Sequence, residues 1–140
     1  MNAAIALTLV RMGGRPCAIP CEHVVEVVPR VLLGHLPDAA PQVLGVINLR
    51  GDVVPVVDVR SKLAGTGELP TPAYQHLVIV RAGARQIGLA VDEVTDVRDV
   101  AAGAIERPSG VAGRPGPGIV RVDSDLVLVL SAEDVLHAIR

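Results

Sequence analysis

The stretch that decides the fold reads Gly45-Val46-Ile47-Asn48-Leu49-Arg50-Gly51-Asp52-Val53-Val54-Pro55-Val56-Val57-Asp58-Val59-Arg60. Its two apolar arms are rich in β-branched residues, which favour strands, and Gly51 supplies the backbone angles that a tight turn needs. The stretch therefore predicts a β-hairpin that stops at Asp58, a good helix N-cap. Arg50 stands between the apolar arms, where it is either a solvated turn residue or a contact point for a partner. Pro55 has no N–H to donate, so it predicts an edge strand or a bulge for the second arm.

The hairpin has a twin, because the chain repeats itself. A shift of 70 residues aligns Thr8–Val27 with Val78–Val97 without a gap. A shift of 73 residues then aligns Gly45–Leu63 with Gly118–Leu136. Similar segments in the same order predict an internal duplication of one structural unit.

The predicted repeats cover approximately residues 5–64 and 75–137, with a linker near 65–73 that is rich in glycine and proline. Each repeat is small for an independent hydrophobic core. We therefore expect one domain over residues 1–140, in which two similar lobes share a core or exchange strands.

The composition favours a folded protein and argues against several classes of function. Half of the residues are hydrophobic and 20% are charged, so disorder is not expected. Tyr74 is the only aromatic residue, which argues against the stacking platforms that bind single-stranded nucleic acid. A net charge of -2 offers no general attraction for phosphate backbones. The sequence shows no apolar run long enough to cross a bilayer and no secretory leader, so a cytoplasmic location is expected.

Short apolar segments separated by turns predict an all-β barrel or sandwich. The expected strands, besides the two hairpins at 45–57 and 119–130, cover residues 5–12, 16–19, 31–36, 76–80 and 86–90. Valines recur every third residue from Val91 to Val100, which indicates a bulged strand or a helical turn that enters a strand. The segment 21–28 fits either a helix or a strand. Ser131 and Asp134 resemble a capping box for a final helix over 132–139.

The sequence assigns no catalytic, cofactor-binding or metal-ligating residue. Its histidines and serines show no metal spacing and no nucleophile elbow, and its glycine-rich loop contains prolines that cannot donate to a phosphate. The adjacent carboxylates Asp92-Glu93 and Glu133-Asp134 are interpreted as solvated faces. Cys17 and Cys21 are interpreted as small buried hydrophobes, with a redox pair as the alternative.

The chain resembles the CheW family, the coupling proteins of bacterial chemosensory arrays, over roughly residues 7–136. The resemblance rests on segments of specific sequence: Cys17-Ala18-Ile19-Pro20, Val24-Val25-Glu26-Val27, Gly45-Val46-Ile47-Asn48-Leu49-Arg50-Gly51, Val54-Pro55-Val56-Val57-Asp58 with Arg60, and Gly88-Leu89-Ala90-Val91-Asp92-Glu93-Val94. It implies an all-β fold of two intertwined five-stranded SH3-like barrel lobes with short helices, including one at the C-terminus.

The resemblance also implies a function without catalysis or cofactors. The family bridges the cytoplasmic tips of chemoreceptors to the regulatory domain of a CheA-type histidine kinase, in arrays attached to the membrane. The receptor tip is expected in a groove between the lobes, which implies these partner-binding residues: Glu26, Arg50, Val24, Val27, Leu49, Val91 and Val94. If Glu26 and Arg50 meet, they orient each other and leave guanidinium donors for a partner.

Two alternatives to a chemotaxis scaffold stay open. One is a CheW-like adaptor of a pathway that controls pili or development instead of flagella. The other is a regulatory module that binds a small molecule between the lobes, although the sequence shows no set of convergent polar groups.

Overall fold

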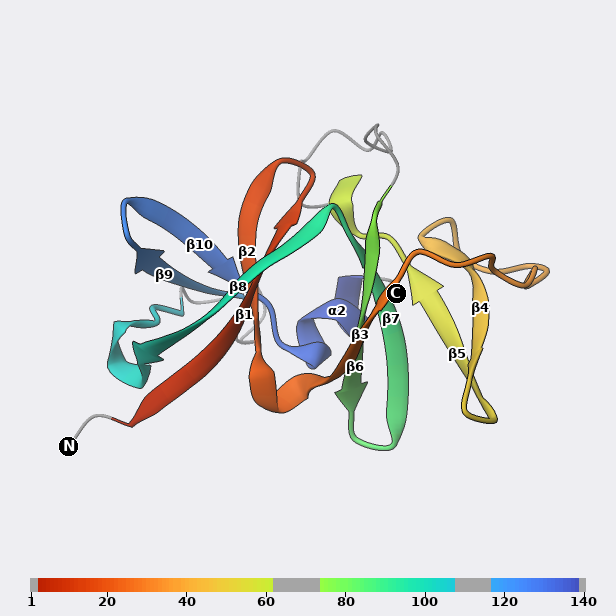
Figure 1. Cartoon of the computed structure of the whole chain (residues 1–140), viewed down its shortest axis with the longest axis horizontal. Coiled ribbons are helices and arrows are strands. Elements are labelled where there is room, and N and C mark those ends of the chain that lie inside the picture. Colours follow the sequence, from red (N-terminus) through yellow and green to blue (C-terminus); the bar gives the residue numbers. More distant parts are fainter. Residues whose placement is uncertain (1–2, 62–73, 108–116, 139–140) are drawn as a thin grey trace.

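The structure, a computed structural model, describes residues 3–61, 74–107 and 117–138. Within these ranges the chain forms ten strands, two short 3-10 helices and the α-helix α2 at Ala132–Ala138 (Figure 1). The strands are β1 (Ala4–Met12), β2 (Arg15–Pro20), β3 (Val24–Pro29), β4 (Val43–Leu49), β5 (Asp52–Val57), β6 (His76–Ala82), β7 (Arg85–Val91), β8 (Glu93–Ala101), β9 (Gly118–Val122) and β10 (Asp125–Val129). The predicted all-β class is confirmed.

The strands form two five-stranded sheets that lie side by side with α2 between them (Figure 1). We call the sheet with strand order β3-β6-β7-β5-β4 lobe 1, and the sheet with order β8-β1-β2-β10-β9 lobe 2. Each sheet combines strands from both halves of the chain, so the lobes are intertwined.

Exchanging the two halves of the chain converts one strand order into the other. The central hairpin β6–β7 of lobe 1 corresponds to β1–β2 of lobe 2, and the hairpin β4–β5 corresponds to β9–β10. In both lobes the link between these hairpins is a parallel pairing, β5 with β7 and β10 with β2. We propose that this correspondence reflects the predicted internal duplication. The predicted linker at 65–73 lies outside the described residues.

A bulge occurs at the same place in the edge strand of each lobe. The register between β3 and β6 skips Val25, and the register between β8 and β1 skips Thr95. The extra residue bends the strand and increases its twist. Of the two alternatives for the valine spacing from 91 to 100, the bulged strand is correct for β8, while Val91 is the last residue of β7. In the ambiguous segment 21–28, a 3-10 turn at Cys21–His23 leads into β3.

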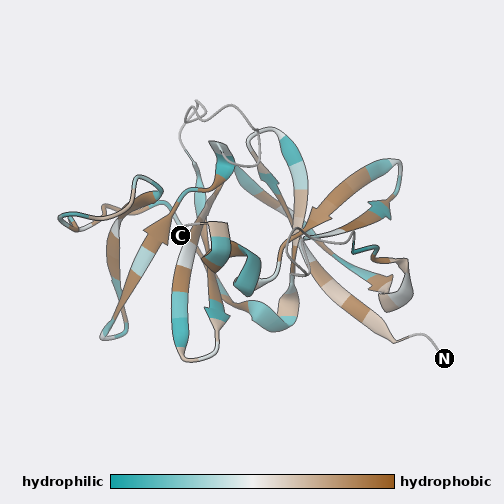
Figure 2. Ribbon diagram, turned by 180° about the vertical axis from the view of Figure 1, so that it is seen from behind, coloured by the Kyte–Doolittle hydropathy of each residue, from teal (hydrophilic) through white to brown (hydrophobic). Residues whose placement is uncertain are grey.

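The hydrophobic core runs across the junction of the lobes. One buried cluster joins Met12 and Ile19 of lobe 2 with Val57 and Leu89 of lobe 1, and Val135 of α2 packs into it. Hydrophobic residues follow the strands of both lobes, while α2 carries hydrophilic residues on its exposed side (Figure 2). Because residues of both sheets fill this cluster, the two lobes bury a common core.

The expected capping box begins the final helix. Ser131 Oγ accepts a hydrogen bond from the backbone N–H of Asp134 at 3.1 Å. In return, Asp134 Oδ2 accepts one from the backbone N–H of Ser131 at 2.8 Å. These bonds satisfy backbone donors that a helix start leaves without partners.

The strand predicted at 31–36 was wrong, whereas the stretch around Pro55 is not an edge strand but lies next to a register shift between β4 and β5. Residues 31–36 form no strand, and only Gly34 pairs there, through an isolated bridge to Val46 of β4. Gly34 and Val46 exchange both backbone hydrogen bonds, at 2.7 and 3.0 Å, so the segment touches the outer edge of β4 at this one recorded bridge. The strand β5, which contains Pro55, lies inside lobe 1 between β7 and β4. Its pairing with β7 is recorded only at Val56 and Val57, so Pro55 stands just before the residues that need donors on that side.

Candidate partner-binding site

Glu26 and Arg50 meet where lobe 1 closes on itself. Glu26 lies on β3 and Arg50 lies in the turn between β4 and β5, and β3 and β4 are the two edges of the sheet. Both terminal nitrogens of Arg50 donate hydrogen bonds to Glu26 Oε1, the one from Nη1 at 2.6 Å. The ion pair therefore joins elements at opposite edges of the sheet.

The two members of the pair differ in exposure. The side chain of Arg50 is 68% exposed, whereas that of Glu26 is 26% exposed. A guanidinium carries five N–H donors, and the two recorded bonds leave the others available. Glu26 therefore holds the side chain in place, and the exposed cation of Arg50 is presented to solvent. An exposed pair of this kind contributes little stability, about 0–1 kcal/mol.

The turn that carries Arg50 is tightly built. Arg50 has a φ of +51° and Gly51 a φ of +90°, the left-handed conformations of a two-residue hairpin turn. Asn48 Oδ1 accepts a hydrogen bond from the Gly51 N–H at 2.9 Å, which fixes the turn from inside. An arginine seldom adopts a left-handed backbone, so its presence at this tip is consistent with a role in recognition.

The structure separates the apolar residues that the resemblance assigned to the groove. Val24, Val94 and Leu49 are half-buried and pack against the core clusters. Val91 is fully buried in the core, because it lies in the central hairpin of lobe 1 where both faces are covered. Its assignment to a partner-binding surface is therefore corrected, since the folded protein offers no surface of Val91 to a partner.

Val27 is 40% exposed, but its side chain lies away from the Glu26–Arg50 ion pair. Along β3 the burial alternates, with Val24, Glu26 and Val28 half-buried and the residues between them exposed. Successive side chains of a strand point to opposite faces. Val27 therefore lies on the other face of β3 from Glu26.

Sequence reasoning missed Val53, which lies three residues after Arg50. Val53 is 70% exposed and pairs with Asn48 across the hairpin. The sequence carried no signal for this, because Val53 and Val54 are the same residue type and only the structure shows that Val54 and Val56 are buried. Arg50 and Val53 together give the β4–β5 tip an exposed cation and an exposed aliphatic group.

A second charged cluster is buried and serves the structure. Arg60 is bidentate to Asp58, with Nε to Oδ1 at 3.0 Å and Nη2 to Oδ2 at 2.8 Å. Its Nη1 donates to Asp92 Oδ1 at 2.5 Å, and Asp92 Oδ2 accepts the backbone N–H of Gly14 from lobe 2 at 3.2 Å. The hydrogen bond to Asp58 is the main reason that the pKa of Arg60 is raised. The interpretation of Asp92 as a solvated carboxylate was wrong, because Asp92 links the two lobes.

The described residues show neither a cluster of metal ligands nor a membrane-spanning helix. Within residues 3–61, 74–107 and 117–138, no three His, Cys, Asp or Glu side chains gather as metal ligands would. In the same part of the chain, no helix has the length and apolar character needed to span a membrane.

Comparisons with known proteins agree on one family. The family model described as a CheW-like domain matches residues 6–140. The chain is 28% identical to "Chemotaxis protein CheW" of Rhizobium meliloti over 139 residues, which covers 96% of this chain and 88% of that protein. It is 36% identical to "Protein PilI" of Pseudomonas aeruginosa over 84 residues, which covers 60% of this chain and 47% of that protein. The crystal structure of the scaffolding protein TtCheW from Thermoanaerobacter tengcongensis superposes with a TM-score of 0.77 at 25% identity, covering 92% of this chain and 85% of that one.

Proposed function

Because the chain belongs to the CheW-like domain family, we propose that it is a non-enzymatic scaffold coupling chemoreceptors to a CheA-type histidine kinase. Its partners are then the regulatory domain of the kinase and the cytoplasmic tips of the receptors. The protein acts in the cytoplasm and is recruited to receptor arrays at the membrane.

The observation that carries this proposal is the arrangement of Glu26 and Arg50. A half-buried carboxylate orients an exposed guanidinium at the tip of a rigid hairpin. Such a preformed cation suits a carboxylate on a partner, because the arginine loses little conformational freedom on binding. Val53, three residues further along the same hairpin, adds an exposed aliphatic group.

One alternative concerns the output of the pathway. The relative named "Protein PilI" shares the family without a chemotaxis name. A CheW-like adaptor in a pathway with a non-flagellar output therefore remains the second candidate. Both candidates share the same binding surfaces, and the cognate kinase and receptors decide between them.

The test is calorimetric titration of the protein with the regulatory domain of the cognate kinase and, separately, with a soluble fragment of the receptor tip. We expect saturable one-to-one binding of each partner to the wild type. Arg50→Glu is expected to weaken binding of the receptor tip or of the kinase domain at least tenfold, about 1.4 kcal/mol. Its free energy of unfolding is expected to fall by no more than about 1 kcal/mol, because the lost ion pair is exposed.

Two further variants sharpen the titration. Arg81→Glu makes the same charge change at another exposed arginine of lobe 1 and is expected to leave both affinities unchanged. The double variant Glu26→Arg with Arg50→Glu restores an ion pair but exposes the opposite charge, so the weakened binding is expected to persist. If the wild type binds neither partner, the scaffold proposal is wrong. If the double variant binds normally, the pair is structural and Arg50 makes no partner contact.

A further inference from the structure

Lobe 2 has its own ion pair between a hairpin tip and an edge strand. Asp123 lies in the turn between β9 and β10, and Arg98 lies on β8, the other edge of that sheet. Arg98 Nη2 donates to Asp123 Oδ2 at 3.0 Å, and Nη1 donates to Oδ1 at 3.3 Å. The pair therefore joins opposite edges of lobe 2, as Glu26 and Arg50 do in lobe 1.

The two hairpin tips correspond in backbone and differ in charge. Asp123 follows Arg50 by 73 residues, the shift that aligns the two long hairpins. Both residues have left-handed backbones, with φ of +51° for Arg50 and +55° for Asp123. The tip of lobe 1 thus presents a cation where the tip of lobe 2 presents an anion. The sequence shows this reversal, but only the structure shows that Asp123 pairs with Arg98, because that contact is non-local.

In each pair the more exposed side chain, Arg50 in lobe 1 and Asp123 in lobe 2, sets the charge that an approaching partner meets. The side chain of Asp123 is 70% exposed and that of Arg98 is 43% exposed. Arg98 also donates from Nε to Asp96 Oδ2 at 3.1 Å, so one cation is shared between two carboxylates. The three groups sum to one negative charge, whereas Glu26 and Arg50 sum to zero.

Asp96 is fixed by a further bond. Its Oδ1 accepts the backbone N–H of Val97 at 2.7 Å. This bond, followed by the hydrogen bond from Arg98, lowers the pKa of Asp96. The pKa of Arg98 is raised, mainly by its hydrogen bond to Asp123. Asp96 therefore keeps its negative charge to lower pH than usual, and Arg98 keeps its positive charge to higher pH than usual.

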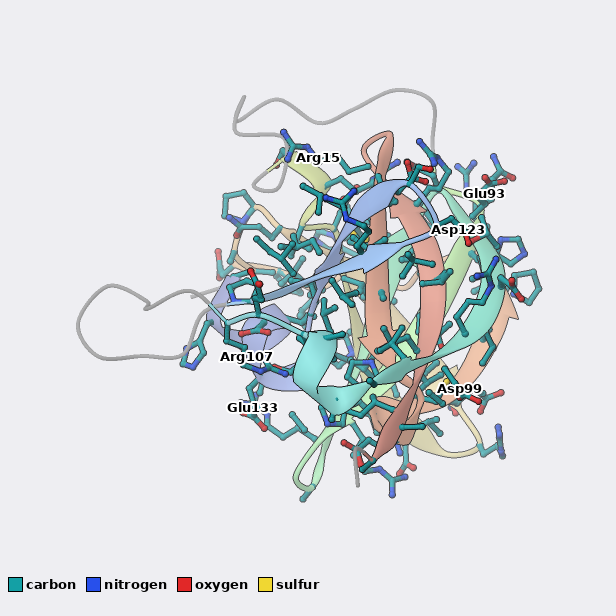
Figure 3. All side chains as sticks on the ribbon, turned by 90° about the vertical axis from the view of Figure 1, so that its left-hand side faces the viewer. Arg15, Glu93, Asp99, Arg107, Asp123 and Glu133 are labelled. Atoms are coloured by element: carbon teal, nitrogen blue, oxygen red, sulfur yellow. The ribbon has the colours of Figure 1, made fainter. Side chains whose placement is uncertain are left out.

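A hollow of about 250 Å³ lies beside this tip. Its walls include the apolar residues Leu9, Pro16 and Val127, the carboxylates of Asp123 and Asp125, and one cation, Arg11. The volume is several times the about 30 Å³ of one water molecule, so it accommodates an aliphatic side chain. Figure 3, which faces the end of lobe 2, shows Asp123 at the hairpin tip beside β8, on the side that also carries Glu93.

We propose that the Arg98–Asp123 tip of lobe 2 is a second protein-docking surface with the opposite charge preference to the Arg50 tip. Its occupant is a protein segment that places a lysine or arginine on Asp123 and a neighbouring aliphatic side chain in the hollow. The carboxylate of Asp123 has about four acceptor positions, so it can accept further donors while Arg98 holds it. The proposal goes beyond the scaffold function inferred from lobe 1, and it does not depend on the identity of the kinase or receptors.

Two matched tripeptides test the charge preference on the wild-type protein. Ac-Leu-Lys-Leu-NH₂ and Ac-Leu-Glu-Leu-NH₂, at millimolar concentration, are titrated into ¹⁵N-labelled protein and followed through the backbone amide resonances. We expect the lysine peptide to shift amides of residues 95–98 and 122–127 at least threefold more than the glutamate peptide does. The shifts are expected to decrease with added salt, because the contact is exposed.

Three variants locate the contact. Asp123→Arg is expected to abolish the lysine-peptide shifts, and its own amide spectrum shows whether it is folded. Asp99→Arg makes the same charge change elsewhere on β8 and is expected to retain them. Arg50→Glu is expected to retain them as well, because it alters the other lobe. Equal shifts by both peptides, no shifts at all, or lysine-peptide shifts that survive in Asp123→Arg would overturn the proposal, whatever the kinase titrations show.

Discussion

Replacing Arg60 by methionine is expected to lower the free energy of unfolding by about 3–5 kcal/mol. The side chain of Arg60 is 4% exposed and that of Asp58 is 2% exposed, so the substitution leaves a carboxylate buried without its cation. It also removes the bond to Asp92, which connects lobe 1 to the β1–β2 turn of lobe 2 through Gly14. Methionine fills a similar volume, which keeps the loss of packing small.

The exposed network of lobe 2 offers a matched control. Arg98 also lies between two aspartates, but its side chain is 43% exposed. Arg98→Met removes the same group from solvent-screened partners, so a loss below about 1 kcal/mol is expected. The comparison isolates burial, because both substitutions delete an arginine that bridges two carboxylates.

The assay is equilibrium unfolding in urea, followed by far-ultraviolet circular dichroism because Tyr74 is the only aromatic residue. We expect the midpoint of Arg60→Met to fall while the slope with urea stays constant, which indicates a change in stability alone. The corresponding drop in melting temperature is about 10–17 °C for a chain of this size. A loss below about 1 kcal/mol for Arg60→Met, or equal losses for the two variants, would refute the reasoning.

Two further predictions concern a glycine and a cysteine. An added Cβ at Gly45 would lie 2.4 Å from the backbone oxygen of Gly34, whereas at Gly118 it would meet the side chain of Ile105 at 2.6 Å. A side chain can move aside and a backbone cannot, so Gly45→Ala is expected to lower the free energy of unfolding in urea by about 1–3 kcal/mol, and Gly118→Ala by less. The reverse order would contradict the steric argument. Burial raises the pKa of the Cys17 thiol from 9.0 to about 11, so the folded protein favours the protonated form. Cys17 is expected to resist Ellman's reagent at pH 8 until the protein unfolds, and its contribution to stability, complete below about pH 9, is lost as the pH rises through about 11; rapid labelling of the folded protein would show that Cys17 is accessible.

The sequence predicted the elements whose signals are local. The β-branched apolar arms on either side of Arg50-Gly51 indicated the first hairpin, and the Ser131–Asp134 spacing indicated the helix start. Each of these signals comes from residues that are close together in the sequence, where backbone preferences act directly. The segment 31–36 shows the limit of such signals, since an apolar run does not say whether a neighbouring strand is available to pair with it.

The candidate site was predicted in part. Glu26 and Arg50 were expected to meet, and the structure places them in contact. The burial of Val91 was not foreseen, because an apolar residue on a matching segment has the same sequence signature in a core as at a surface. The pairing of Arg98 with Asp123, and that of Arg60 with Asp92, joins residues 25 and 32 positions apart, and no local pattern reports such contacts.

By itself, the sequence determined the all-β class and the turns of the two long hairpins, and it predicted two similar halves. Turn chemistry and side-chain periodicity are properties of short segments, so they can be read without knowing the fold. The tertiary structure alone decided which strands each lobe takes from each half, and that Arg50 pairs with Glu26 while Asp123 pairs with Arg98. Those outcomes depend on burying a common core and on which edge strand meets which turn, and both are contacts between distant parts of the chain.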